Sequence, residues 1–174
     1  SVRTAALITN MDSPLGSAVG NSLEVIESVE ILKGKTSGDL WTVCRELSCR
    51  MLMLAGIGDK DECGRLVDEA VESGEALKRF EMMVKLQGGD VSYIEDTSKF
   101  RKASFSREVY APADGYITHM DSEKIGLTAV LLGAGREKKD DDINHAAGII
   151  IAAKTGDFVK RGELLATLFA DDES

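Results

Sequence analysis

Residues 4–16 read TAALITNMDSPLG. Residues 4–9 form a short apolar run that is typical of a buried strand, and the turn-forming residues after it end the run. A buried strand needs neighbours in a sheet, yet no other segment before residue 90 has strand character. The pattern therefore predicts a strand whose sheet lies outside this sequence, and we expect the chain to be a fragment.

Helices are predicted from the turn to residue 89, because apolar residues recur there at helical spacing. The clearest stripe runs from Leu40 to Ala55, where Ser37 or Asp39 can cap the start and Gly56 or Gly58 can end the helix. Similar stripes occupy residues 23–32, 63–71 and 77–84, which are followed by Gly34, Ser73-Gly74 and Gly88-Gly89.

Strands are predicted from about Glu108 onward, because the apolar period shortens and turn residues multiply. Residues 125–135 are too mixed to assign, and residues 136–142 are typical of a solvated charged loop. The expected strands lie at residues 108–111, 116–120, 148–153 and 164–169, with Phe158 and Val159 between two glycine turns. The sequence thus predicts an α+β chain with a first unit at 1–90, a linker at 91–107 and a second unit at 108–174.

The composition limits the function. The chain has 174 residues, a formal net charge of -9 and 43% hydrophobic residues, which is ordinary for a folded protein. The acidic balance disfavours nucleic acid as a partner, since phosphate contacts need a basic surface. No apolar run approaches the roughly 18 residues that span a bilayer, and no signal-peptide pattern opens the sequence. We therefore expect a cytoplasmic protein without a membrane segment.

Cysteine and histidine provide no evident metal site. Cys44, Cys49 and Cys63 do not have zinc-site spacing with His119 and His145. We expect three reduced thiols, with Cys44 and Cys63 packed on apolar helical faces. Cys49 lies off this stripe, and the sequence does not decide whether it is buried. His119, in a predicted strand, and His145 are expected to be structural or surface residues.

The turn between the first predicted strand and the first helix has two chemical interpretations. Its glycines leave backbone amides that could meet an anion at a helix start, although glycines at such turns more often serve backbone geometry. The carbonyl oxygens of Leu15 and Ala18, with the carboxylate of Glu27, could instead converge on a hard cation. Both interpretations remain open at this point.

Several strings, in order along nearly the whole chain, resemble the pyrimidine-nucleoside phosphorylase and thymidine phosphorylase family. They lie at residues 6–16, 18–25, Phe80 with 87–90, 111–116, 125–126, 131–136, 156–157, 159–160 and 162–163. The resemblance implies that residues 1–90 are the carboxy-terminal part of the central α/β phosphorylase domain, a remnant with a helical segment. It further implies that residues 108–174 are the carboxy-terminal domain, an α/β-hammerhead-like β unit.

The resemblance also implies an activity. Intact family members use phosphate to cleave thymidine, deoxyuridine or uridine into free base and pentose 1-phosphate. The groups that bind phosphate and base come from an earlier part of the family's sequence, so we assign no catalytic residue here. We expect this chain alone to be inactive, and we expect the homodimer of the family to form through a helical domain outside it.

One site carries over from the family. The resemblance implies that a potassium ion is held by the backbone carbonyls of Leu15 and Ala18 and by Glu27. The remaining ligands in the family belong to the phosphate-binding loop, which lies outside this sequence. We therefore expect potassium binding by this chain alone to be weak.

Two alternatives compete with the phosphorylase interpretation. The second unit also resembles a biotinyl or lipoyl carrier domain, in which Lys102 would carry the cofactor, but the residues before Lys102 depart from that pattern. Alternatively, the chain is a non-catalytic interaction module, in which the exposed edge of the strand at residues 4–9 pairs with another copy.

Overall fold

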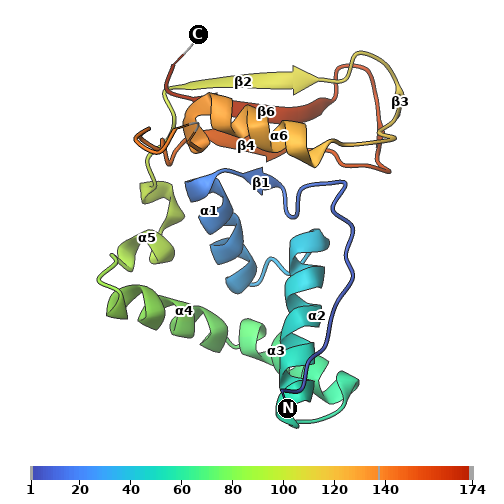
Figure 1. Cartoon of the computed structure of the whole chain (residues 1–174), viewed down its shortest axis with the longest axis vertical. Coiled ribbons are helices and arrows are strands. Elements are labelled where there is room, and N and C mark those ends of the chain that lie inside the picture. Colours follow the sequence, from blue (N-terminus) through green and yellow to red (C-terminus); the bar gives the residue numbers. More distant parts are fainter. Residues whose placement is uncertain (1, 137, 173–174) are drawn as a thin grey trace. The chain divides into compact units, whose positions relative to one another are not determined.

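The computed structural model describes residues 2–136 and 138–172. These residues form two compact units (Figure 1). The first contains the residues up to Thr9 together with Ser28–Thr97, and the second contains Asn10–Glu27 together with the chain from Ser98 onward. The helix at 21–32 passes from the second unit to the first. The predicted domain ranges 1–90, 91–107 and 108–174 stay a prediction.

The helices between residues 21 and 99 confirm the four predicted apolar stripes. The elements are α1 (Asn21–Leu32), α2 (Gly38–Ala55), α3 (Lys60–Glu72), α4 (Glu75–Leu86) and α5 (Ser92–Glu95), followed by the 3₁₀ turn η1 (Thr97–Lys99). Gly56 ends α2 in the left-handed conformation with φ of 79°, as predicted. Ser37 occupies the position before α2, but its side chain makes no capping hydrogen bond.

The prediction for the cysteines was partly wrong. Cys49 and Cys63 are fully buried, whereas Cys44 is exposed. The cause is the face by which α2 contacts α3: Cys49 lies on it and approaches the carbonyl oxygen of Lys60 at 3.4 Å. The apolar stripe that contains Cys44 and Met51 instead borders an open groove.

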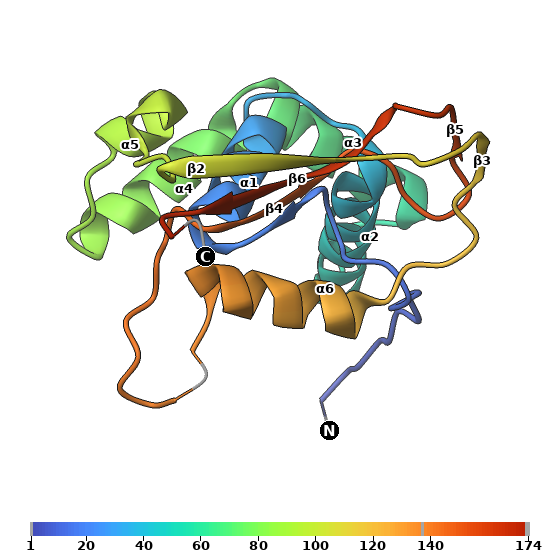
Figure 2. The ribbon, with the colours of Figure 1, turned by 90° about the horizontal axis from the view of Figure 1, so that it is seen from above.

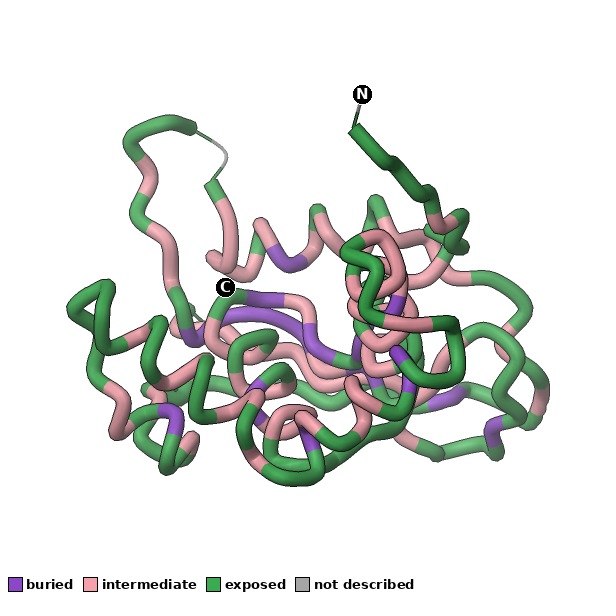
Figure 3. Tube along the Cα trace, turned by 90° about the horizontal axis from the view of Figure 1, so that it is seen from below, coloured by how far each residue is buried: buried purple, intermediate pink, exposed green. Residues whose placement is uncertain are grey.

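The predicted strand at residues 4–9 is absent from the described structure. Residues 2–9 have no regular secondary structure, and Figure 3 shows this segment almost entirely exposed. Ile8 is 97% exposed. A strand forms only where a neighbour supplies ladder hydrogen bonds, and no described strand pairs with this segment.

The second unit is built on a four-stranded antiparallel sheet with the order β1-β4-β6-β2. Ile149 of β4 lies opposite Leu168 of β6, and helix α6 packs over this face through Ala129 and Ile125 (Figure 2). The strands are β1 (Ala18–Val19), β2 (Phe105–Tyr110), β4 (Gly148–Ile151) and β6 (Leu164–Ala170), and β3 (Gly115–Tyr116) pairs with β5 (Phe158–Val159). The α+β fold class is confirmed.

The structure also corrects the predicted strands of the second unit. In the predicted range 116–120 only Tyr116 belongs to a strand, so His119 lies in irregular backbone. The unassigned range 125–135 contains most of helix α6 (Ser122–Ala129) and the single π-helical turn η2 (Val130–Ala134). Strand β1 was not predicted, because it consists only of Ala18–Val19 and is too short to show an apolar period. Among the helices of the described residues, none has the length and apolar character to cross a membrane.

Candidate cation site in the turn before helix α1

The turn that precedes α1 is closed by carboxylates of that helix. Glu27 accepts hydrogen bonds from the backbone amides of Ser17, at 2.7 Å, and Ala18, at 3.1 Å. Glu24 accepts a further bond from the amide of Gly20 at 3.0 Å. The amides considered for an external anion therefore bind carboxylates of the chain itself.

Gly16 makes this arrangement possible. It adopts φ of 75°, and a Cβ at this position would lie 2.5 Å from Oε2 of Glu27. The carboxylate of Glu27 therefore lies against the backbone of the turn at Gly16. Of the predicted ligand residues, Glu27 thus contacts Ala18 through the Ala18 amide, and convergence of the carbonyl oxygens of Leu15 and Ala18 on an ion stays a prediction.

The chemistry of this donor set fits a potassium ion. A carboxylate offers about four lone-pair positions, and the two amides use two of them. In potassium channels, rings of backbone carbonyl oxygens replace the water shell of the ion, so carbonyl oxygens are suitable potassium ligands. By contrast, the described residues contain no group of three or more His, Cys, Asp or Glu side chains arranged to hold a metal ion. A site here would therefore depend on carbonyl oxygens together with Glu27.

The other side of the turn is held by the segment around β4. The ammonium group of Lys154 donates to the carbonyl oxygen of Pro14 at 2.8 Å. The amide of Ile151 donates to the carbonyl of Ser17 at 2.7 Å, and the hydroxyls of Ser13 and Thr155 lie 3.3 Å apart. No local pattern in the sequence indicates a role for Lys154, because its contact with Pro14 spans 140 residues.

The histidines lie on the surface of the second unit. His119 and His145 are both exposed, and the backbone carbonyl of His145 accepts a bond from the amide of Ser22 at 3.1 Å. The prediction that they are structural or surface residues is confirmed.

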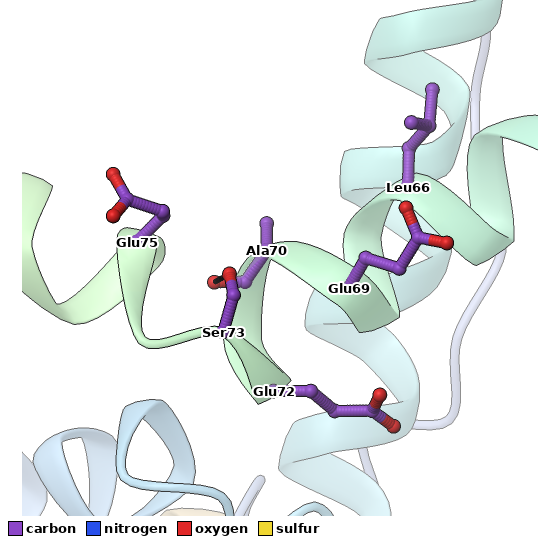
Figure 4. Close-up of a pocket in the computed structure, with 6 residues that line it drawn as sticks. All are labelled: Leu66, Glu69, Ala70, Glu72, Ser73 and Glu75. Carbon is purple, nitrogen blue, oxygen red and sulfur yellow. Dashed lines mark hydrogen bonds between the residues drawn. The ribbon is translucent and has the colours of Figure 1, made fainter.

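Two further pockets lie in the first unit. An apolar groove of about 650 Å³ is lined by residues of α1 to α4, among them Trp41, Met51 and Phe80, and has few polar groups. A second pocket of about 580 Å³ has three carboxylates at its rim (Figure 4), but Glu69, Glu72 and Glu75 point away from one another. Neither pocket presents converging groups for catalysis.

Known proteins match the chain along nearly its whole length. The profile of the pyrimidine nucleoside phosphorylase C-terminal domain matches residues 116–174. The pyrimidine-nucleoside phosphorylase of Bacillus subtilis (strain 168) is 40% identical over 173 residues, which cover 99% of this chain and 40% of that protein. The corresponding enzyme of Geobacillus stearothermophilus is 37% identical, over 98% of this chain and 40% of its own length.

The chain belongs to the pyrimidine-nucleoside phosphorylase family. The predicted family is thereby confirmed, and the match to a carboxy-terminal domain shows that the chain contains the carboxy-terminal part of such a protein. The chain spans about 40% of the length of the phosphorylases that it matches.

Lys102 differs from a carrier lysine in its surroundings. It is exposed in the irregular segment between η1 and β2, and not at a turn between two strands. Its neighbour Arg101 bonds to Asp171 and to Asn144, which ties this segment to the end of β6. Family membership and this position both favour a phosphorylase over a carrier.

Proposed function

We propose that the chain is the carboxy-terminal part of an enzyme that cleaves thymidine, deoxyuridine or uridine with phosphate. In this reaction a phosphate oxygen forms the new bond to C1′ of the sugar while the bond from C1′ to the base nitrogen breaks. The electron pair of the broken bond leaves with the base. The observation that carries the proposal is the 40% identity to a pyrimidine-nucleoside phosphorylase along 99% of this chain.

The part of the site that this chain contributes is the turn before α1. We propose that the carbonyls of Leu15 and Ala18 and the carboxylate of Glu27 hold a potassium ion. A bound potassium ion would supply fixed positive charge near the phosphate-binding part of the enzyme. Contact between the Glu27 carboxylate and the backbone at Gly16 supports this assignment, because it places an anionic oxygen ligand at the turn.

The remaining catalytic groups are proposed to lie in the rest of the family's sequence, which also carries the homodimer interface. A phosphorolysis assay with thymidine and with uridine tests this division. We expect no turnover by this chain alone, and turnover after mixing with an amino-terminal fragment of the Bacillus subtilis relative. Turnover by the chain alone would contradict the division, and the absence of turnover after verified association of the two parts would contradict the proposed activity.

A further inference from the structure

We propose that Lys154 is a positioning residue for the cation-binding turn, and that it fixes the carbonyl of Leu15 through the neighbouring peptide group. The inference rests on the proposed potassium site. It gives residues 154–157, which lie within the part matched to the carboxy-terminal domain, a role in cation binding.

The backbone of Lys154 is itself fixed. Its amide donates to Oδ2 of Asp157 at 2.8 Å, which closes the turn between β4 and β5. From this anchored backbone the side chain reaches the carbonyl oxygen of Pro14 in a half-buried position. The ammonium group therefore connects two backbone segments whose own positions are restricted.

Consecutive peptide planes explain why this contact controls Leu15. Each peptide group is planar, so holding its oxygen or its nitrogen orients the whole plane. Lys154 holds the plane between Pro14 and Leu15, and Glu27 holds the plane between Gly16 and Ser17 through the Ser17 amide. The carbonyl of Leu15 belongs to the single plane between these two.

The carbonyl of Ala18 has different anchors. The plane before it is held at both ends, because Ile151 donates to the Ser17 carbonyl and the Ala18 amide donates to Glu27. Ala18 also pairs with Ile150 in the sheet. Loss of the Lys154 contact should therefore loosen the Leu15 side of the site and leave the Ala18 side in place.

Potassium titration of the ¹⁵N-labelled chain tests the inference without an activity assay. Potassium chloride replaces N-methyl-D-glucamine chloride at constant ionic strength, so that screening stays fixed. The amide shifts of Ser17 and Ala18, which bond to Glu27, report the binding. Because a hydrogen bond of this kind contributes a modest net free energy, K154M is expected to weaken potassium affinity about threefold to tenfold.

The matched control is K160M. Lys160 is an exposed lysine that follows β5, and its backbone amide, which bonds to Glu163, survives the change. We expect its potassium affinity to equal that of the wild type. K154Q is measured as a second replacement, and the amides of β4 and β6 in the same spectra report whether each variant is folded.

The outcomes separate the inference from the proposed function. Because this chain alone is expected to bind potassium weakly, the shifts of the wild type need not saturate. A wild-type chain in which potassium causes no specific shift at Ser17 and Ala18 contradicts the potassium site itself. If folded K154M or K154Q binds potassium as tightly as the wild type, or more tightly, only the role of Lys154 is overturned. If both variants lose the fold, the wild-type chain provides the test. Potassium should then shift the Nζ resonance of Lys154 and leave that of Lys160 unchanged. Equal shifts of the two resonances would overturn the inference.

Discussion

Arg45 donates two parallel hydrogen bonds to Asp68, from Nε to Oδ1 and from Nη2 to Oδ2, each 2.6 Å long. This pair joins α2 to α3. The bond from Arg45 lowers the pKa of the Asp68 carboxyl, and the same bond raises the pKa of Arg45. Gly64 leaves room for the guanidinium, since a Cβ there would lie 2.8 Å from Nη2 of Arg45.

Gly64→Ala should therefore change the stability of the first unit differently in two backgrounds. Alanine in a helix interior is ordinarily favoured over glycine by about 1 kcal/mol. With Arg45 present, the new methyl displaces the guanidinium from Asp68, so the gain in stability should vanish or become a loss. The loss should not exceed about 1 kcal/mol, because this partly exposed ion pair is itself of modest strength. In the Arg45→Met background the gain should return.

Urea unfolding followed by the fluorescence of Trp41, the only tryptophan, measures this double-mutant cycle. Trp41 lies in α2, so its signal reports the first unit. Equal effects of Gly64→Ala in both backgrounds would show that the guanidinium and Gly64 are independent.

Gly16→Ala should cost more stability than a glycine change of similar backbone geometry elsewhere in the second unit. Gly162 has φ of 82°, close to the 75° of Gly16, and nothing lies within 4 Å of a Cβ placed there. Gly162→Ala should cost about 1 kcal/mol of backbone strain. Gly16→Ala should cost about 2–4 kcal/mol, because the methyl also displaces Glu27 from the amides of Ser17 and Ala18.

Urea unfolding of the two variants, followed by the amides of β4 and β6, compares these costs. In Gly16→Ala the amide resonances of Ser17 and Ala18 should also shift, and in Gly162→Ala they should not. Equal unfolding free energies would mean that Glu27 contributes nothing to the turn.

Local features of the sequence predict the helices. Most structural features that the sequence does not predict depend on contacts between residues far apart in the chain. The end of α2 at Gly56 and the placement of Leu15, Ala18 and Glu27 near one turn follow from spacing and resemblance. The contact between Lys154 and Pro14 does not, because its partners are 140 residues apart.

The wrong predictions for the cysteines and for a strand at residues 4–9 have the same cause, which is that burial and pairing depend on distant partners. An apolar period identifies which faces of a helix can be buried, but it does not say which face meets a neighbour. Cys49 is buried because α3 contacts its side of α2, whereas Cys44 faces the apolar groove. The run at residues 4–9 has strand character, but a strand also needs a partner, and the described chain provides none there.

Arg101→Met should raise the pKa of Asp171. The side-chain bond from Arg101, followed by the amide of Ser104, lowers this pKa from 3.8 to about 2. The pKa of Asp171 is lower in the folded than in the unfolded chain, so the ionised carboxylate stabilises the fold. This stabilisation is complete above about pH 4 and is lost as the pH falls toward 2. In Arg101→Met the pKa should return part of the way to 3.8, because the Ser104 amide still donates at 2.8 Å.

A carboxyl ¹³C titration by NMR measures this pKa directly. Lys102→Met is the control, since Lys102 is the exposed neighbour of Arg101. An Asp171 pKa that stays near 2 in Arg101→Met would assign the shift to other groups.

Thiol labelling under native conditions should modify Cys44 well before the other cysteines. Cys44 is exposed, whereas Cys49 and Cys63 are fully buried, and burial raises the pKa of the Cys63 thiol. Because the thiolate is the reactive form, both access and pKa slow Cys63. With a chromogenic disulfide reagent, one thiol should react in a fast phase, and Cys44→Ser should remove that phase. A fast phase that persists in Cys44→Ser would show that α2 and α3 open readily.

Gly20 and Gly148 allow the backbones of β4 and the start of α1 to approach more closely than side chains would permit. A Cβ on Gly20 would lie 2.5 Å from the carbonyl oxygen of Ala147, and one on Gly148 would contact the carbonyl oxygen of Val19. Both obstacles are backbone atoms and cannot rotate away. Both glycines also adopt positive φ, 144° and 150°.

Gly20→Ala should therefore destabilise the second unit by at least about 3 kcal/mol, as backbone strain and the clash add. Gly126→Ala is the matched control, because Gly126 lies in α6 of the same unit with open space at its Cβ position. There alanine should stabilise the unit by up to about 1 kcal/mol through helix propensity. Hydrogen exchange of the β4 and β6 amides in urea measures both effects, and a mild result for Gly20→Ala would mean that β1 can separate from β4 without unfolding the sheet.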